Sequence, residues 1–219
     1  MKRRNLRLSL TRLPLFLVLF CFSGWAQGAS YEVIVTGADG APLSGAAVYL
    51  QATGDDIEIE APVAGAIDQV NKQFAPHMLV VQRGAQVSFP NSDSIKHHVY
   101  SFSAVKTFEL KLYAQRAETA IVFDRAGVVE LGCNIHDWML GYVYVVDTPY
   151  FAKSDSNGSA LIEAPNGKYI ISAWHPRMQE DPGDLALASQ SDVMTYRIVL
   201  QMPLLPDYRA RSTADFDDY

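Results

Sequence analysis

The stretch that decides the fold is "GVVELGCNIHDWMLGYVYVVD", residues 127–147. Its two ends are apolar runs rich in Val and Tyr, a composition typical of β-strands. Between them lies a connection that holds Cys133, His136 and Met139 and is too short to contain regular structure. Such a loop directs several side chains at one spot. Thiolate and thioether groups are soft metal ligands and imidazole binds several transition metals, so the three residues are either neighbours in a core or ligands of one metal ion.

The rest of the chain repeats the strand pattern. Short apolar or alternating runs are separated by turn clusters such as "GADG", "PNSD", "DSNG" and "APNG". This pattern predicts an all-β fold built from antiparallel β-sandwiches. No long stretch has a convincing helical period, although "AIDQVNKQF" (66–74) is compatible with one or two helical turns. The expected strands are "YEVIVT", "AAVYL", "MLVVQ", "QVSF", "HHVYSFS", "VVELGC", "YVYVV", "YIISAW" and "YRIVL".

The first 28 residues have the features of a secretion signal. Five basic residues precede the apolar run "LPLFLVLFCF" (13–22), and the small residues of "GWAQGAS" (24–30) follow it. The run is short for a membrane span, so we expect cleavage near Gly28 and Ala29 and no stable membrane insertion afterwards; an uncleaved anchor is the alternative. The sequence therefore predicts export to the periplasm.

The charge of the chain and its cysteine content limit the functions that it can have. The chain has a formal net charge of −6, and removal of the basic leader would make it more acidic still. This acidity argues against nucleic-acid binding. Cleavage would also remove Cys21, which leaves Cys133 without a partner for an intramolecular disulfide. A buried inert thiol and a metal ligand are the two interpretations of Cys133.

Residues 67–147 resemble a cupredoxin, the blue-copper β-sandwich. "FAPHMLVVQRGAQVSFPNSDSIKHHVYSF" (74–102) is similar to the opening of that family, and "GVVELGCNIHDWMLGYVYVVD" is similar to its close. The Cys-x2-His-x2-Met spacing resembles the ligand loop of amicyanins, and the combination is similar to proteins called methylamine-utilisation proteins. The resemblance implies one type 1 copper ion, held by His97, Cys133, His136 and Met139. Zinc is the competing metal, but it usually avoids thioether ligands.

The second imidazole comes from "KHHVY" (96–100), where two histidines are adjacent. The family pattern places the ligand at His97 and puts His98 where an asparagine usually ties the ligand-bearing segments together. We expect His98 to make that tie less well, by a hydrogen bond to Asn134. The alternative has His98 as the ligand. Adjacent strand residues face opposite sides of a sheet, so only one of the two imidazoles can easily face the metal.

A second family resemblance covers two segments that are far apart in the chain. "VIVTGADGAPLSGAAVYLQ" (33–51) resembles the opening of a transthyretin-like, or carboxypeptidase regulatory-like, sandwich. The matching continuation, "KSDSNGSALIEAPNGKYIISAWHP" (153–176), comes about a hundred residues later. We therefore expect a cupredoxin Greek-key sandwich inserted into this second sandwich. The predicted parts are a signal peptide (1–28), a discontinuous transthyretin-like sandwich (31–56 and 148–203), a cupredoxin domain (57–147) and a disordered acidic tail (204–219).

The function that these resemblances imply is one-electron transfer, with no enzymatic activity. Redox proteins would be the partners, an amine dehydrogenase as donor and a c-type cytochrome as acceptor being the pair that the family likeness suggests. Copper handling is an alternative, and so is carbohydrate or surface binding by the second sandwich with a structural copper module. A copper enzyme would need a second metal centre with His-x-His pairs, which the sequence lacks.

Four residues outside the ligand set have open roles. His77 is expected at an edge or surface, with a second metal contact as the alternative, and His175 in a turn or a domain contact. Trp138 and Leu140 flank the ligands. They form either an apolar docking patch around the edge of His136 or a cap on the core beneath the metal.

Overall fold

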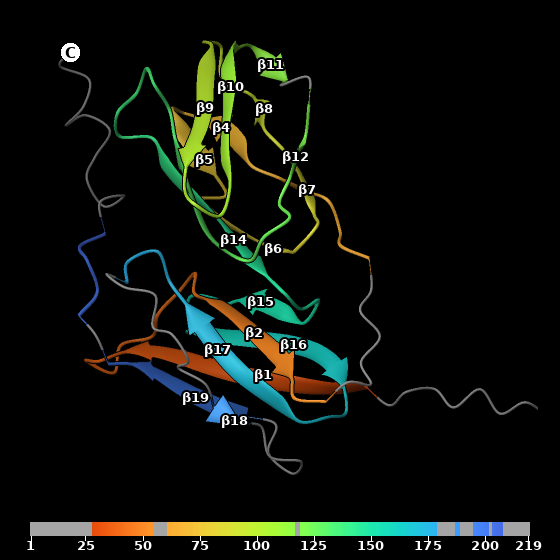
Figure 1. The fold of residues 1–219 in the computed structure, drawn as a ribbon. Coiled ribbons are helices and arrows are strands. Elements are labelled where there is room, and N and C mark those ends of the chain that lie inside the picture. Colours follow the sequence, from red (N-terminus) through yellow and green to blue (C-terminus); the bar gives the residue numbers. More distant parts are fainter. Residues whose placement is uncertain are drawn as a thin grey trace, which may run out of the picture.

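The computed structural model describes residues 28–54, 61–116, 119–178, 187–188, 195–201 and 203–207. These residues form strands and irregular segments without a helix. Accordingly, none of them belongs to a helix long and apolar enough to span a membrane. The prediction of an all-β fold with one sandwich inserted into another is confirmed: β3 to β14 form an inner sandwich, and the strands on either side of them in the chain form an outer one (Figure 1).

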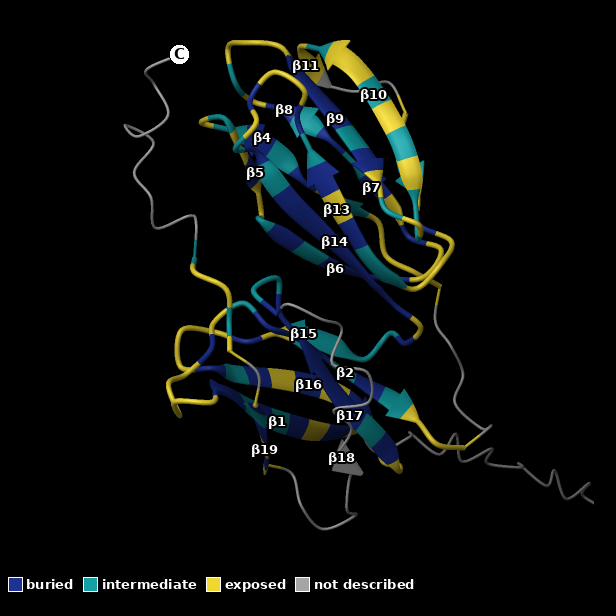
Figure 2. Cartoon of the chain, turned by 60° about the vertical axis from the view of Figure 1, so that its left-hand side comes forward, coloured by how far each residue is buried: buried dark blue, intermediate teal, exposed yellow. Residues whose placement is uncertain are grey.

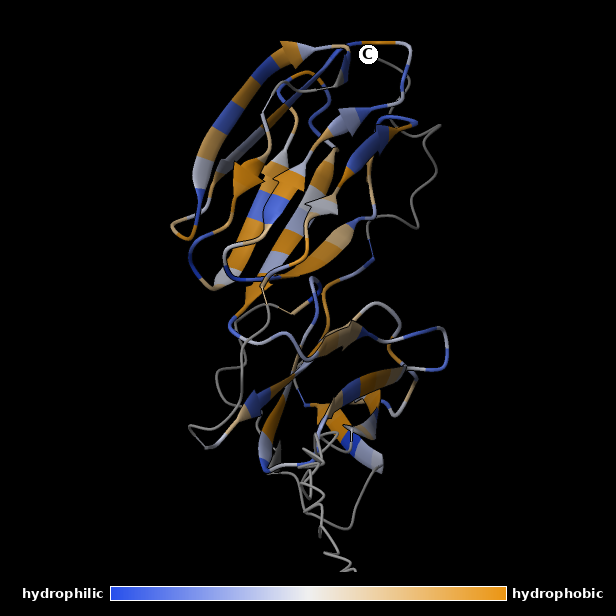
Figure 3. Ribbon diagram, turned by 90° about the vertical axis from the view of Figure 1, so that its right-hand side faces the viewer, coloured by the Kyte–Doolittle hydropathy of each residue, from blue (hydrophilic) through white to orange (hydrophobic). Residues whose placement is uncertain are grey.

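The larger sheet of the inner sandwich carries the site. Its strand order is β10-β9-β13-β14-β6, and all neighbours are antiparallel except β14 and β6, which run parallel. The central strands are mostly hydrophobic, whereas β10 at the edge is largely exposed (Figure 2 and Figure 3). The bounds of the strands are β6 Met78–Gln82, β9 His97–Phe102, β10 Thr107–Tyr113, β13 Gly127–Gly132 and β14 Leu140–Val146.

Two small sheets cover the inner face of this sheet. One has the order β11-β8-β4-β5 and the other the order β12-β7-β3. The core between the layers is apolar and includes Phe89, Phe123, Leu131 and Val143, which are all buried. The strands are β3 Gly65–Ala66, β4 Asp68–Val70, β5 Gln73–Ala75, β7 Gln86–Ser88, β8 Pro90–Asn91, β11 Gln115–Arg116 and β12 Ile121–Val122.

The helical alternative for residues 66–74 is wrong. The segment is a hairpin in which β4 and β5 pair antiparallel. Asn71 and Lys72 both have positive φ, 54° and 56°, as a tight hairpin turn requires. The backbone N–H groups of both residues donate to the carboxylate of Asp93, at 2.6 and 2.9 Å. A contact with a distant residue thus stabilises a turn that the local sequence signals poorly.

The outer sandwich has one sheet of order β16-β1-β19 and one of order β15-β2-β17-β18. β1 pairs antiparallel with β16 and parallel with β19, so the first and last described strands of the chain are neighbours. β1 begins at Gly28, the last residue of the expected signal peptide (1–28), and the rest of that peptide, residues 1–27, lies outside the described residues. The strands are β1 Gly28–Gly37, β2 Ala47–Ala52, β15 Phe151–Lys153, β16 Ser159–Pro165, β17 Tyr169–Trp174, β18 Leu187–Ala188 and β19 Thr195–Leu200.

The two sandwiches share one apolar contact, the seam. Met78, Val80, Tyr142 and Tyr144, on the outer face of β6 and β14, are buried in the same cluster as the outer-sandwich core. Trp174 stacks on Tyr144 with ring centroids 4.8 Å apart and an interplanar angle of 16°. Because both faces of β14 are buried, this strand is apolar along almost its whole length.

Candidate metal centre

The register of one hairpin gathers the loop residues. Gly132, at the end of β13, pairs with Leu140, at the start of β14, so residues 133–139 must turn back within a narrow gap. The backbone N–H of Met139 donates to the carbonyl of His136 at 2.9 Å and tightens the turn. The thiol of Cys133 is free and buried. The loop therefore directs Cys133 and His136 toward the same end of the inner core.

β9 supplies the second imidazole. The Sγ atom of Cys133 lies 3.9 Å from Nδ1 of His97 and 3.8 Å from Nδ1 of His136. Ligand atoms of the three residues all lie within 4.8 Å of one another, and within the described part of the chain this is the one His, Cys, Asp and Glu group so placed. Bonds of about 2.3 Å to sulfur and about 2.0 Å to nitrogen, at angles near 120°, imply a sulfur-to-nitrogen separation of about 3.7 Å. The three side chains therefore fit around one metal ion.

The site is almost closed to solvent. The exposed fractions are 0% for His97, 2% for Cys133 and 9% for His136, so His136 is the residue that reaches the surface. Burial lowers the pKa of His136, and the nearby His97 and Lys72 lower it further, although Asp93 acts in the opposite direction. The imidazole of His136 is thus favoured in its neutral form, the form that binds a metal.

Asp93 holds His97 in place, and the sequence interpretation missed it. Its Oδ2 atom lies 2.7 Å from Nε2 of the fully buried His97. Burial alone would raise the pKa of Asp93. Hydrogen bonds from the Lys72 amide, His97 and the Asn71 amide outweigh that effect and keep the pKa below its usual value. A carboxylate four residues before a candidate ligand histidine is the signal that could have indicated it, because ligating histidines donate their other N–H to such a group.

His98 faces away from the site. Its Nε2 atom lies 2.9 Å from Oε1 of Glu109 on β10, while Nδ1 is buried without a hydrogen-bond partner among the described atoms. The expected bond from His98 to Asn134 is therefore wrong. The alternation of β9 explains the outcome, since it points His97 into the core and His98 to the opposite face of the sheet.

Met139 lies in the same apolar cluster as Cys133 and is equally buried. It is the last residue of the loop, directly before β14. The role of axial ligand remains a prediction.

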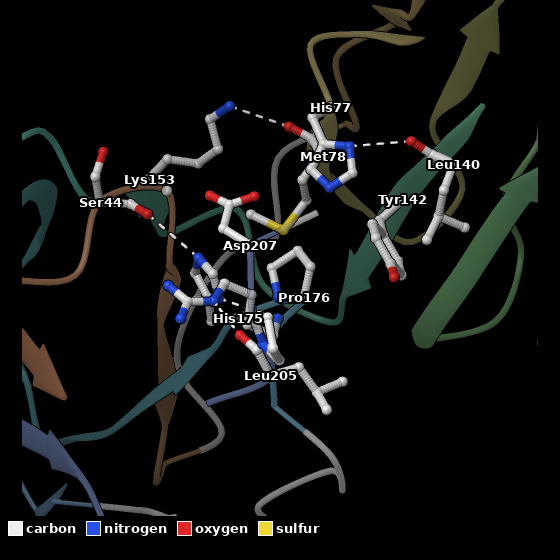
Figure 4. Close-up of a pocket in the computed structure, with 13 residues that line it drawn as sticks. Ser44, His77, Met78, Leu140, Tyr142, Lys153, His175, Pro176, Leu205 and Asp207 are labelled. Atoms are coloured by element: carbon white, nitrogen blue, oxygen red, sulfur yellow. Dashed lines mark hydrogen bonds between the residues drawn. The ribbon is translucent and has the colours of Figure 1, made fainter. Parts of the chain in front are cut away.

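Trp138 and Leu140, the two residues that flank the ligands, lie in different surroundings. Trp138 packs on the inner core, with its ring centroid 5.2 Å from that of His136. It also lines a groove with Ile95, between the β4–β5 turn and the 93–95 loop. Leu140 instead lines a cavity at the seam between the two sandwiches (Figure 4). Ile135 and Ile95, which the sequence analysis did not single out, are 49% and 40% exposed.

The other two histidines lie at the seam. His77 is half-buried, and its Nδ1 atom lies 3.0 Å from the carbonyl oxygen of Leu140. His175 is buried in the turn after β17, where Nδ1 accepts from the Arg177 amide and Nε2 lies 3.2 Å from the carbonyl of Ser44. Neither belongs to the group around Cys133.

No protein-family model matches the chain, and no curated protein sequence matches it. Solved structures do match part of the chain. A purple cupredoxin from Nitrosopumilus maritimus is 22% identical with a TM-score of 0.34, over 37% of this chain and 99% of that one. An oxidised amicyanin with one proline replaced by alanine is 25% identical with a TM-score of 0.34, over 38% and 82% of the two chains. The copper-containing nitrite reductase of Thermus scotoductus SA-01 is 19% identical with a TM-score of 0.36, over 51% of this chain and 28% of the reductase.

Proposed function

We propose that this chain is a type 1 copper protein that carries single electrons between redox partners in the periplasm. His97, Cys133 and His136 would form the trigonal set of ligands, with Met139 as the weak axial ligand. The observation that carries the proposal is the convergence of two Nδ1 atoms on one thiol at 3.9 and 3.8 Å, in a pocket that is almost fully buried. Copper in such a set supplies a Cu(I)/Cu(II) couple.

The protein's contribution is rigidity and exclusion of water. His97 is held by β9 and Asp93, whereas Cys133 and His136 are held by the paired ends of β13 and β14. A fixed ligand geometry suits both oxidation states, so little reorganisation accompanies electron transfer. The closed site also argues against copper handling, because ligand exchange with a partner needs accessible donors.

Electrons would enter and leave through the edge of His136. It is the most exposed of the three residues. Trp138 is in contact with its ring, the exposed Ile135 precedes it in the chain, and the exposed Ile95 lines a groove with Trp138. A small apolar surface suits the brief encounters of redox proteins. This surface replaces the predicted patch of Trp138 and Leu140, since Leu140 lies at the seam.

The partners that we propose are an amine dehydrogenase as donor and a c-type cytochrome as acceptor. Two points support this choice: the likeness of the ligand loop to amicyanins, and the expected signal peptide. Reduction of the copper-loaded chain by a methylamine dehydrogenase, followed by stopped-flow spectroscopy, tests the donor. A rate no faster than that of free Cu(II) would exclude it.

The copper site itself is tested by optical spectroscopy. Oxidised, copper-loaded protein is expected to show an intense visible thiolate-to-copper band with a stoichiometry of one copper per chain. Cys133→Ser should abolish the band, because the hydroxyl cannot replace the thiolate. Met139→Gln is the matched control, since it should keep the band while changing the reduction potential. Colourless Cu(II)-loaded wild-type protein would refute the proposal.

A further inference from the structure

The strands that carry His97 and lead to Cys133 are joined at one place. β9 begins at His97, and β13 ends at Gly132, directly before Cys133. The two strands are neighbours in the sheet (Figure 2), but within the described residues their ladder consists of one pair, Tyr100 opposite Gly132. This pair is therefore the ladder contact between β9 and β13, and it lies next to the thiol.

β13 is attached more closely to its other neighbour. It pairs with β14 at every residue from Gly127 to Gly132. On the side of β9, the amide of Glu130 donates to Oγ of Ser103 at 2.9 Å, so a side chain takes the place of a backbone acceptor. The spacing between β9 and β13 thus depends mainly on the pair that Tyr100 forms.

The ring of Tyr100 lies on Gly132. Residues directly opposite each other in a ladder point to the same face, and here it is the outer face, since Cys133 next to Gly132 points into the inner core. A Cβ atom at Gly132 would lie 2.6 Å from Cζ of Tyr100 and 2.7 Å from its Oη. The ring thus fills the place of the side chain that Gly132 lacks. Glycine weakens a strand, and an aromatic ring across the ladder compensates for that loss.

Neighbouring side chains hold this ring. Its centroid lies 5.6 Å from that of His98 and 5.0 Å from that of Phe102. Nε2 of His98 lies 2.9 Å from Oε1 of Glu109, so this imidazole is itself held in place. Tyr100 belongs to neither of the two apolar cores. Its ring therefore packs on the sheet at Gly132 rather than in the interior of either sandwich.

We propose that Tyr100 is a positioning residue of the candidate metal centre. Its ring holds Gly132 against β9 and thereby fixes the Cys133 thiol relative to the imidazole of His97. The use of this fixed spacing rests on the proposed function, because it matters for a metal ion that both groups hold. The contacts themselves involve the chain alone, so the positioning can be measured in metal-free protein.

The reaction of Cys133 with dithionitrobenzoate, in the full chain without metal, measures how firmly the thiol is held. Every protein carries Cys21→Ser, which makes Cys133 the one thiol present. Cys133 is 2% exposed, so the reagent reaches it only after a local opening. Tyr100→Ala should raise the rate at least about tenfold, whereas Tyr100→Phe keeps the ring and should stay within about twofold of the wild type.

Tyr49→Ala is the matched control, since it removes another half-buried tyrosine, from β2 of the outer sandwich. Its thiol rate should stay close to that of the wild type. Urea denaturation gives the rate that global unfolding alone allows, and the rate of Tyr100→Ala should exceed it. An unchanged rate in Tyr100→Ala, or an equal rise in Tyr49→Ala, would overturn the proposal.

Gly132→Ala shows whether the ring and the glycine act together. The added methyl group displaces the ring, so the thiol rate should rise in this variant as well. In the double variant with Tyr100→Ala the methyl group has room, and the rate should equal that of Tyr100→Ala alone. A double variant whose rate increase is the product of the two single increases would contradict the proposal.

Copper binding provides the second readout. Tyr100→Ala should weaken the affinity for copper by about tenfold, as the loss of a residue that orients a ligand does, and Tyr100→Phe should restore it. Equal affinities in Tyr100→Ala and the wild type would overturn the positioning role. A wild-type chain that binds no copper would instead refute the proposed function, and the thiol rates would still decide whether Tyr100 holds Cys133.

Discussion

At the scale of single residues, Asp93 links two parts of the site. Its carboxylate accepts from His97 and from the amides of Asn71 and Lys72, so one side chain holds both a candidate ligand and the turn beside it. A carboxylate on the far nitrogen of a ligating imidazole orients the ring and increases its basicity. In this fold the carboxylate also brings a negative charge close to the metal position.

Asp93→Asn is expected to raise the reduction potential of the copper-loaded protein. Loss of the negative charge disfavours Cu(II) more than Cu(I). Loss of a carboxylate that holds a ligating histidine typically changes metal affinity by about 10–100-fold. A tenfold change in the affinity for Cu(II) relative to that for Cu(I) corresponds to about 60 mV for a one-electron couple. Spectroelectrochemical titration measures the shift.

The matched control is Asp124→Asn, which removes a carboxylate that pairs with Lys106 at the surface. Its potential should stay close to that of the wild type. A lower potential in Asp93→Asn, or equal shifts in both variants, would contradict the role of Asp93. Thermal denaturation of both proteins shows whether the fold is kept.

At the scale of elements, turns position the strands of the outer sandwich. The "DSNG" turn (155–158) precedes β16, and the amides of Asn157 and Ser159 both donate to the carboxylate of Asp155. Gly158 has φ of +75°, and its carbonyl accepts from the amide of Val35 on β1. The turn thus lies directly against β1, and the strand pairing of β1 with β16 follows from it.

Gly158→Ala should be far more destabilising than Gly45→Ala. Both glycines have positive φ, which costs other residues about 1–2 kcal/mol. A Cβ at Gly158 would also lie 2.4 Å from the Val35 carbonyl oxygen, whereas one at Gly45 meets nothing within 4 Å. We expect a loss of at least about 3 kcal/mol for Gly158→Ala and about 1 kcal/mol for Gly45→Ala.

Urea denaturation of the two variants measures these losses. Equal midpoints would show that the close approach to Val35 does not determine the cost. The strand register around the turn can be checked in the same samples from the amide spectrum of β1.

At the scale of the whole molecule, the seam makes one core out of two sandwiches. Tyr144 stacks on Trp174 and lies in ring contact with Tyr49, so the outer face of the metal-bearing sheet is buried by the other sandwich. We therefore expect the wild-type chain to unfold in a single cooperative transition. The outer sandwich then contributes to the metal centre by stabilising β14, the strand on which its loop ends.

Trp174→Ala should lower stability by about 3–5 kcal/mol, the usual cost of removing a buried aromatic side chain. Because Trp174 belongs to the seam, the loss should also separate the unfolding of the two sandwiches into two calorimetric transitions. Trp138→Ala is the control, since Trp138 packs on the core of the inner sandwich. A single transition in Trp174→Ala, with the calorimetric and van't Hoff enthalpies still equal, would count against a seam that couples the sandwiches.

The sequence by itself determined the elements and the loop. Runs such as "MLVVQ" and "YIISAW" coincide with β6 and β17, and the spacing of Cys133 and His136 places both in one short connection. These features are local, because side-chain alternation and loop length depend on neighbours in the chain. Residues 1–27 of the expected signal peptide lie outside the described residues, and the signal peptide stays a prediction.

Only the tertiary structure decided which groups meet across long sequence separations. It placed His97 rather than His98 beside Cys133, brought Asp93 onto His97 and into the 71–72 turn, and moved Leu140 from the metal face to the seam. The physical reason is that the alternation of side chains along a strand predicts two faces but not which element covers each face. The inner core covers one face of β9, and Trp174 covers the outer face of β14. The covering residues lie far from these strands in the chain, so the local sequence cannot indicate them.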